Sequence, residues 1–417
     1  MKKLIENIIN SSCIKIIDFA LPLLIIPYVI SKIGMSAFGV FSVCLTLANF
    51  IITFNDFGLN TILSKKVAQN EEKNTHQQLV CLHTNIKIRL YLLILLIIIP
   101  LPILVPQFPL QLIICFAIGI FFETISPLAY FQGIQQLRFA LVIQATCRIL
   151  SSILIFLLIS DPSDEITYAA LHNLSYVINS IILLLFLKKK FDIEIKLINI
   201  PSIQFKKTLQ ESWEIYSYRL LGSIINPLVS SFISYFYGTS VVTVYSISQR
   251  VCSSVSRIYE PISNVMFPHI SKIVTIDLAR FKKHCFIYLV FLLSTSLIII
   301  FITVYFQDTI HIYLANRTFT YEEKAIYLFT ILMILTSVAN YFICHVIIAL
   351  NNSKIIIMNV GLSLLFFTIA LIYISIFNSP AFSVPLSLFL SDAFLTLTLF
   401  ITTLSLLKTR HHQVVTS

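Results

Sequence analysis

Ten charged side chains lie inside long apolar stretches of this sequence, where an unpaired charge is unfavourable. Five are basic (Lys15, Arg148, Arg219, Arg250 and Arg257) and five are acidic (Asp18, Asp56, Glu123, Glu260 and Asp392). A charge at the centre of a membrane helix costs about 2.5–3.5 kcal/mol on insertion scales. These ten groups must therefore face one another or a water-filled cavity rather than lipid.

The basic residues are the ones whose chemistry points to a solute. Lys15 and Arg257 each have an acid three residues further along, so they can pair on one helix face. Arg148, Arg219 and Arg250 lie near the middle of their apolar stretches with no acid within a helical turn. A guanidinium fork suits phosphate oxygens. We therefore expect a cationic lumen for an anionic solute, and the alternative is pairing with an acid on another helix. The residues predicted to line this lumen are Arg148, Arg219, Arg250, Arg257 and Lys15.

Three of the acids, Asp56, Glu123 and Asp392, are candidates for coupling transport to a proton or sodium gradient. For Asp56 and Glu123 the alternative is a salt bridge to Arg148 or Arg219, and we favour that alternative. The sequence shows no catalytic motif, because it has no HExxH, no GxSxG and, with 8 glycines, no phosphate-cradling loop. Its 8 cysteines form no CxxC pair, so we expect no disulfide framework and no metal site.

The composition places these charges in a polytopic membrane protein. The chain is 57% hydrophobic and 12% charged, with a mean hydropathy of +0.90. A soluble domain is about a quarter charged, so this chain could not cover a water-facing surface. The net charge of +10 reflects a bias of the loops toward one side of a membrane, and we expect no nucleic-acid partner.

Apolar stretches predict an all-α fold of twelve membrane spans, each long enough to cross a hydrocarbon core. The predicted spans are 11–32, 36–62, 81–105, 108–130, 139–159, 166–187, 211–237, 240–268, 284–306, 324–349, 355–376 and 384–407. They form two six-helix bundles, residues 1–190 and 211–417, joined by a cytoplasmic linker at 191–210. With both termini in the cytoplasm, the inner loops and helix ends would hold 21 of the 29 basic residues, Arg89 among them. The outer side would hold Lys32, Arg317 and Lys324.

The two halves also share a local pattern. An apolar run with proline breaks at Gly34 and resumes as Phe38 to Val43, and a similar run breaks at Gly238 and resumes as Val241 to Ile247. The two glycines lie about half a chain apart. Such repeats build many secondary transporters.

Two stretches of the sequence are distinctive: Leu21 to Ser42, followed by Asp56-Phe57-Gly58-Leu59, and Tyr237 to Val251 in the second half. They resemble the Wzx-type O-antigen flippases, in the polysaccharide-exporter branch of the multidrug/oligosaccharidyl-lipid/polysaccharide exporter superfamily. Where members of that family often have arginine after the Asp-Phe-Gly-Leu motif, this chain has Lys65-Lys66. The two lysines keep the positive charge but lack the planar guanidinium fork of arginine.

The resemblance implies a function, a fold and partners. It implies a V-shaped exporter that flips undecaprenyl-diphosphate-linked repeat units across the bacterial inner membrane by alternating access. Membrane lipid, an O-antigen polymerase and a chain-length regulator are the implied partners. Two alternatives stay open: a multidrug or small-molecule exporter of the same superfamily, and a glycan-assembly enzyme such as an O-antigen polymerase.

Overall fold

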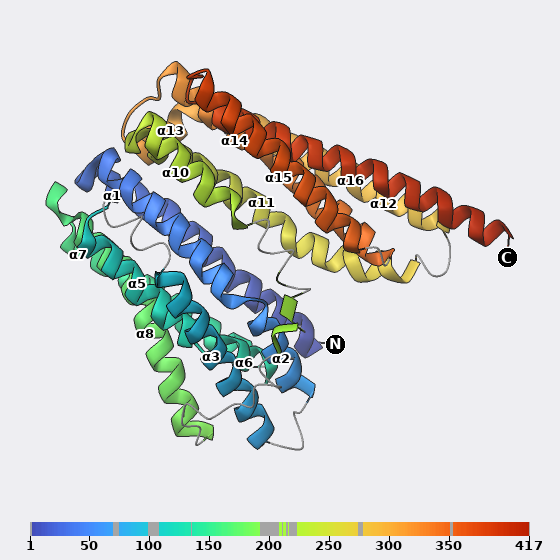
Figure 1. Ribbon diagram of the computed structural model, residues 1–417, viewed down its shortest axis with the longest axis horizontal. Coiled ribbons are helices and arrows are strands. Elements are labelled where there is room, and N and C mark those ends of the chain that lie inside the picture. The colour runs from blue at the N-terminus through green and yellow to red at the C-terminus, as the bar shows by residue number, and fades with distance from the viewer. Residues whose placement is uncertain are drawn as a thin grey trace. The chain divides into compact units, whose positions relative to one another are not determined.

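A computed structural model describes residues 2–69, 75–98, 108–134, 136–191, 208–210, 212, 213, 216, 223–273, 278–350 and 353–416. Within these ranges the chain is helical and forms no strand (Figure 1). The first half contains α1 (Lys2–Asp56), α2 (Leu59–Gln69), α3 (Thr75–Ile98), α5 (Leu110–Ile125), α6 (Leu128–Gly133), α7 (Leu137–Leu158), the 3-10 turn η1 (Pro162–Asp164) and α8 (Glu165–Phe191). The second half contains α10 (Ile225–Tyr237), α11 (Thr239–Ile273), α12 (Leu278–Tyr305), α13 (Gln307–Ala315), α14 (Tyr321–Ala349), α15 (Ser353–Ile376) and α16 (Ser383–Thr416).

The predicted all-α membrane fold is confirmed, and a helix lies at each predicted span. The first two spans are the two arms of α1, and the fourth is α5 continued by α6. In the described part, 8 helices are long and apolar enough to cross a membrane. The chain divides into two compact units, Met1–Leu228 and Val229–Ser417. The predicted domain bounds stay a prediction, because the linker largely falls outside the described residues.

The repeated glycines take the same unusual backbone conformation. Gly34, inside α1, has φ 84° and ψ 164°, and Gly238, between α10 and α11, has φ 90°. L-residues rarely adopt such φ values, and the conformation of Gly34 belongs essentially to glycine. A Cβ at either position would meet nothing within 4 Å, so backbone conformation and not space requires glycine there. This shared break supports the internal repeat read from the sequence.

A tyrosine near each glycine ties its helix to a turn late in the same unit. Tyr28 Oη donates hydrogen bonds to the carbonyl oxygens of Ile159 (2.7 Å) and Phe156 (2.9 Å), where α7 ends. Tyr237 Oη donates to the carbonyl oxygen of Ser379 (2.6 Å), between α15 and α16. The two units thus use the same device, although the tyrosines occupy different positions in the repeat.

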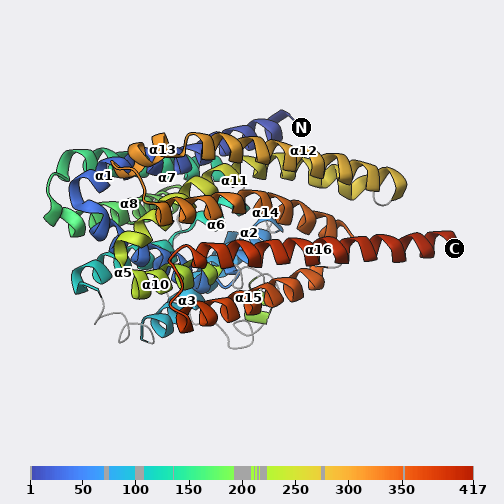
Figure 2. The ribbon, with the colours of Figure 1, turned by 90° about the horizontal axis from the view of Figure 1, so that it is seen from above.

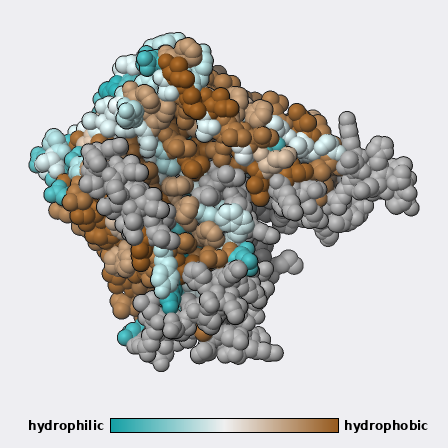
Figure 3. Space-filling model, viewed as in Figure 1, coloured by the Kyte–Doolittle hydropathy of each residue, from teal (hydrophilic) through white to brown (hydrophobic). Residues whose placement is uncertain are grey.

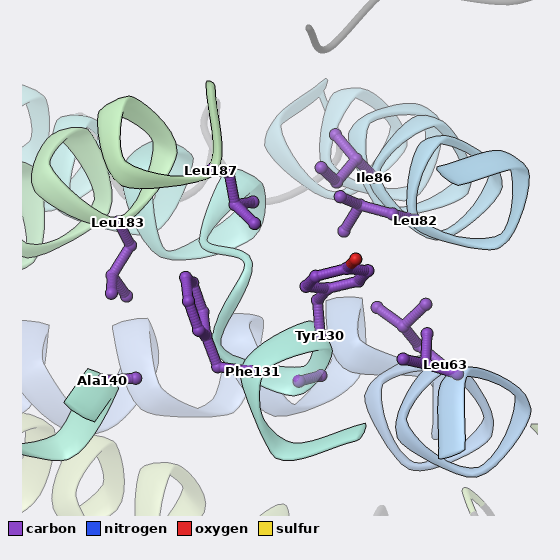
Figure 4. Close-up of a cluster of buried hydrophobic side chains, with 10 residues drawn as sticks. Leu63, Leu82, Ile86, Tyr130, Phe131, Ala140, Leu183 and Leu187 are labelled. Atoms are coloured by element: carbon purple, nitrogen blue, oxygen red, sulfur yellow. The ribbon is translucent and has the colours of Figure 1, made fainter. Parts of the chain in front are cut away.

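The core of the first unit gathers around the short helix α6. Figure 4 shows Tyr130 between α2 and α3, and Phe131 facing α7 and α8. The buried residues of this cluster are Leu63, Val67, Leu82, Ile86, Ala129, Tyr130, Phe131, Ala140, Leu183 and Leu187. At Gly133 a Cβ would come within 2.9 Å of the Ser64 carbonyl oxygen, so glycine lets α6 approach α2 closely.

In the second unit α14 is the central helix. It packs against α11, α12, α15 and α16, and the ribbons of α14 and α16 run side by side in Figure 2. The most apolar part of α14 is 61% buried, against 17% for α12. On α12 and α15 large apolar side chains such as Phe301 and Ile369 are exposed. In Figure 3 hydrophobic residues make up much of the visible surface, as lipid contact requires.

One helix was not expected from the sequence. Residues 307–323 were predicted to be an outer loop, and they contain α13. Asp308 in its first turn complements the helix dipole, and Asn316 ends it in the left-handed conformation with φ 55°. The segment is too polar and too short to register as a span, which is why a search for spans misses it.

Candidate functional site

Arg89, on α3, is a deeply buried charge of the first unit. Its side chain is 2% exposed. Nη1 donates to Asn60 Oδ1 (3.3 Å) and Nη2 donates to the backbone oxygen of Glu123 (3.2 Å). Arg89 was predicted among the cytoplasmic segments and helix ends; its side of the membrane stays a prediction, whereas the burial of its side chain was not predicted. The sequence does indicate this burial, because Arg89 lies well inside the predicted span 81–105.

Asp56 stands where the second span breaks. α1 ends at Asp56 and α2 begins at Leu59, and between them Phe57 has φ 44° and Gly58 has φ 72°. Asp56 Oδ1 accepts a hydrogen bond from the backbone N–H of Asn60 (3.4 Å), so Asp56 caps the new helix. The Asp-Phe-Gly-Leu motif therefore encodes a helix break with its own cap.

Arg89, Asp56 and Glu123 form one charged centre. Arg89 interacts electrostatically with both acids, and Glu123 also interacts with Arg148 on α7. Arg148 is partly buried, and its Cζ lies 5.9 Å from the centroid of the Tyr176 ring. Glu123 thus interacts with Arg148, one of the two arginines that the sequence offered as partners, and both acids interact with Arg89, which it did not offer. The predicted salt bridges to Arg148 or Arg219 stay a prediction. The role of the two acids in ion coupling stays a prediction as well.

Polar groups with unused hydrogen-bonding capacity surround this centre. Asn55 Nδ2 donates to Thr124 Oγ1 (2.7 Å), whereas Asn55 Oδ1, Asn85 Nδ2 and Arg89 Nε have no partner among the described residues. A cavity of about 20 Å³ lies beside Asn85, enough for one water molecule. Its lining is Leu59, Ile62, Leu63, Lys66, Cys81, Thr84, Asn85 and Thr208. The cavity thus has room for one water molecule beside Asn85, which lies one helical turn before Arg89 on α3.

The other predicted lumen residues are distributed over both units. Arg250 is partly buried and Arg257 is exposed, both on α11. Arg219 and the side chain of Lys15 lie outside the described residues. Each unit is described separately, so the predicted common lumen of Arg148, Arg219, Arg250, Arg257 and Lys15 stays a prediction.

Asp392, on α16, is the candidate coupling acid that lies in the second unit. It interacts electrostatically with Tyr245 and Cys252 on α11. No described residue forms an ion pair with it. Tyr245 Oη and Asn340 Oδ1 are buried without a hydrogen-bond partner in the described ranges. Asp392 therefore differs from Asp56 and Glu123, which share Arg89. Within the described part, no three His, Cys, Asp or Glu side chains are grouped so as to hold a metal ion.

Comparison with known proteins gives one family and several similar structures. A family model described as "Polysaccharide biosynthesis protein" matches residues 4–274. The chain is 21% identical over 275 residues to a "Putative O-antigen transporter" of Escherichia coli (strain K12), an alignment that spans 65% of this chain and 66% of that protein, just under two thirds of its length.

Two solved structures share the fold over nearly the whole chain. The lipid II flippase MurJ in an inward closed conformation matches with a TM-score of 0.74 and 15% identity, over 94% of this chain and 87% of that one. An inward-facing multidrug resistance MATE family transporter of the MOP superfamily matches with a TM-score of 0.72 and 13% identity, over 96% and 95% of the two chains. At these identities the likeness concerns the fold.

Proposed function

We propose that this chain, which belongs to the polysaccharide biosynthesis protein family, flips lipid-linked O-antigen or polysaccharide repeat units from the cytoplasmic to the periplasmic face of the bacterial inner membrane. The observation that supports this most is the combination of two matches. The family model covers residues 4–274, and the lipid II flippase MurJ shares the fold over 94% of the chain. The proposed carrier is undecaprenyl diphosphate, and the proposed orientation has both termini in the cytoplasm.

The proposed mechanism is alternating access between the two units. The lipid tail stays in the bilayer while the diphosphate and the sugars cross through a polar path. An unpaired diphosphate would face a barrier of several kcal/mol in a low-dielectric slab. Arg148 and Arg250, partly buried in different units, would lower that barrier. Arg219, Arg257 and Lys15 are the other proposed contributors.

Asp392 is the best candidate for coupling transport to a proton or sodium gradient. A coupling acid must take up and release a cation in each cycle, and a fixed partner such as Arg89 opposes that exchange. Asp56 and Glu123 have Arg89, whereas Asp392 has no ion pair in the described part of the chain. We therefore place Asp392 ahead of the other two acids. No catalytic step is proposed, and an O-antigen polymerase and a chain-length regulator are proposed as partners.

Deletion of the gene tests the proposal in cells. We expect the deletion strain to lose surface O-antigen and to accumulate lipid-linked repeat units, and the wild-type gene to reverse both effects. A multidrug exporter of the same fold would leave O-antigen intact and change drug sensitivity. A polymerase defect would leave single repeat units attached to the surface polysaccharide core, so the length of the surface glycan separates all three functions.

A further inference from the structure

The helix break at Asp56–Leu59 is covered by aromatic residues from a distant part of the chain. Tyr216 stacks on Phe57 with ring centroids 4.2 Å apart and an interplanar angle of 29°. Trp213 lies 5.9 Å from Phe57 and 6.0 Å from Tyr216, and Phe54 meets Tyr216 edge to face at 5.7 Å. All four residues belong to the first unit. Trp213 and Tyr216 nevertheless lie in the predicted seventh span, which leads into α10.

The backbone under this stack is strained. Phe57 has φ 44°, which is uncommon for a residue other than glycine and unfavourable for a bulky one. A strained residue persists only where its surroundings hold it. Here the holding contact is the ring of Tyr216, which is 2% exposed. If the ring left, Phe57 could relax to a negative φ and α1 could continue into α2 as one helix.

Relaxation of the backbone at Phe57 would change the contacts of the charged centre formed by Arg89, Asp56 and Glu123. Asn60 is held by both ends of the break, since its N–H binds Asp56 Oδ1 (3.4 Å) and its Oδ1 accepts from Arg89 Nη1 (3.3 Å). A continuous helix would turn Asn60 away from this position, because its N–H would bind a backbone carbonyl one turn earlier. The stack and the hydrogen bond to Arg89 should therefore form and break together.

We propose that Phe57, Trp213 and Tyr216 form an aromatic latch that opens and closes in each transport cycle. In the closed state, the stacked rings hold the start of the seventh span against the break in the second span. The hydrogen bond between Asn60 and Arg89 is then kept. In the open state, the latch frees the seventh span and lets the second span straighten. An element with two discrete packings is what large conformational changes require. Tyr216 and Phe57 act as positioning residues, and the inference rests on the proposed function only in that some cargo is moved.

A reversible cross-link tests whether the latch must open. F57C and Y216C are introduced together in a cysteine-free background and joined with a short bis-methanethiosulfonate reagent. The matched control is F232C with F236C, because those rings lie 4.5 Å apart on the same helix, α10. The double-cysteine variant lacks both rings, so its export before cross-linking is the reference level. We expect the latch cross-link to lower that export at least tenfold further, reductant to return it to the reference level, and the control cross-link to have little effect. Export unchanged by the latch cross-link would overturn the proposal, and so would a failure to cross-link.

The single tryptophan supplies a second test that needs no cargo. Trp213 is 55% exposed, and it is the only tryptophan in the chain. In purified protein, acrylamide should quench Trp213 more strongly when the latch is free than when it is cross-linked, because the free latch samples the open state. Equal quenching would overturn the latch whether or not the protein exports glycan. The wild-type gene could fail to restore O-antigen while quenching still differed between the free and the cross-linked latch. That result would contradict the proposed function and leave the latch supported.

The conservative variant separates stacking from hydrogen bonding. Tyr216 Oη is buried without a partner among the described residues. Y216F should therefore keep the export rate and the quenching of the wild type, whereas Y216A should lower export several-fold and raise quenching. Loss of export in Y216F equal to that in Y216A would show that the hydroxyl, and not the ring stack, carries the effect, and would overturn the latch.

Discussion

Arg89 Nη2 donates to the backbone oxygen of Glu123 and not to its carboxylate, over 3.2 Å. The guanidinium therefore fixes the end of α5 through its backbone while its charge offsets the carboxylates of both Glu123 and Asp56. One side chain from α3 thus links α5 to the helix break before α2. This link makes the charged centre a structural element of the first unit.

Removing the guanidinium should destabilise the protein strongly. Arg89→Ala leaves two acids near each other without their cation, and breaking a buried pair in this way costs about 3–5 kcal/mol. Glu123→Gln keeps the backbone acceptor and should cost much less. Arg257→Ala, at an exposed site, is the control. Thermal unfolding in detergent measures all three, and equal melting temperatures for Arg89→Ala and Arg257→Ala would contradict the assignment.

Replacing Gly34 or Gly238 by alanine should destabilise the protein, although the added Cβ would meet no atom within 4 Å. Alanine at Gly34 or Gly238 must adopt a positive φ, which costs on the order of 1–3 kcal/mol. Gly361 is the control, because it also has nothing within 4 Å but carries no positive φ. Gly361→Ala in the middle of α15 should stabilise by about 0.5–1 kcal/mol. Thermal unfolding should therefore move in opposite directions, and a loss of stability in all three variants would refute the role of φ.

Much of this fold could be predicted from hydropathy, because a membrane span needs only length and apolar composition. The Gly34 and Gly238 breaks could also be predicted, since the repeat aligned them. The charged centre could not be assembled in the same way. Arg89 and Glu123 lie on α3 and α5, which pack against each other, and no single-helix pattern shows which faces meet. α13 was missed because its polar residues resemble those of a loop.

The pattern around Asp56 shows the same limit. Asp-Phe-Gly-Leu could be recognised as a family-like motif, yet its physical role follows from φ at Phe57 and from the Tyr216 ring. The partner lies more than a hundred residues away in sequence. Backbone strain at a non-glycine residue leaves no signature in composition.

Stability should fall as the pH falls from about 6.5 to 4 because of His311, on α13. The side chain is fully buried against Phe319, with ring centroids 3.9 Å apart, and burial lowers the pKa of His311 to about 4. The folded state thus binds fewer protons than the unfolded state in this window. The stability contributed by neutral His311 is complete above the unfolded value of about 6.5 and is lost toward pH 4, by on the order of 1–3 kcal/mol.

His311→Phe checks this assignment, because phenylalanine keeps the ring contacts and removes the titration. Its melting temperature should change less than that of the wild type between pH 7 and pH 4.5. The neighbouring ion pair of Asp308 and Lys324 does not contribute to this pH dependence. The hydrogen bond from Lys324 (2.8 Å) holds the pKa of Asp308 below its ordinary value. That pair is lost only at still lower pH. If His311→Phe left the pH dependence of the melting temperature unchanged, another group would be its source.

Arg250 should matter for transport more than for folding. Arg250→Ala would remove the proposed charge-assisted contact to the diphosphate, a kind of contact worth about 1.5–3 kcal/mol, so export should fall by about tenfold or more. Arg250→Lys should keep part of the activity, because the charge remains while the fork is lost. Surface O-antigen in the deletion strain reports activity, and the amount of protein in the membrane reports folding. Full complementation by Arg250→Ala at the native expression level would make Arg250 a structural counter-ion.

The sidedness of the lipid-linked repeat unit tests the flippase function most directly. Purified protein is reconstituted into vesicles that carry labelled lipid-linked repeat units, and an impermeant glycan-oxidising reagent reports the outer-facing fraction over time. We expect the inner pool to become accessible in vesicles with the wild-type protein, and to do so much more slowly with Arg250→Ala. If protein-containing and protein-free vesicles protected the inner pool equally, with the protein folded and a cation gradient applied, the proposed function would be contradicted.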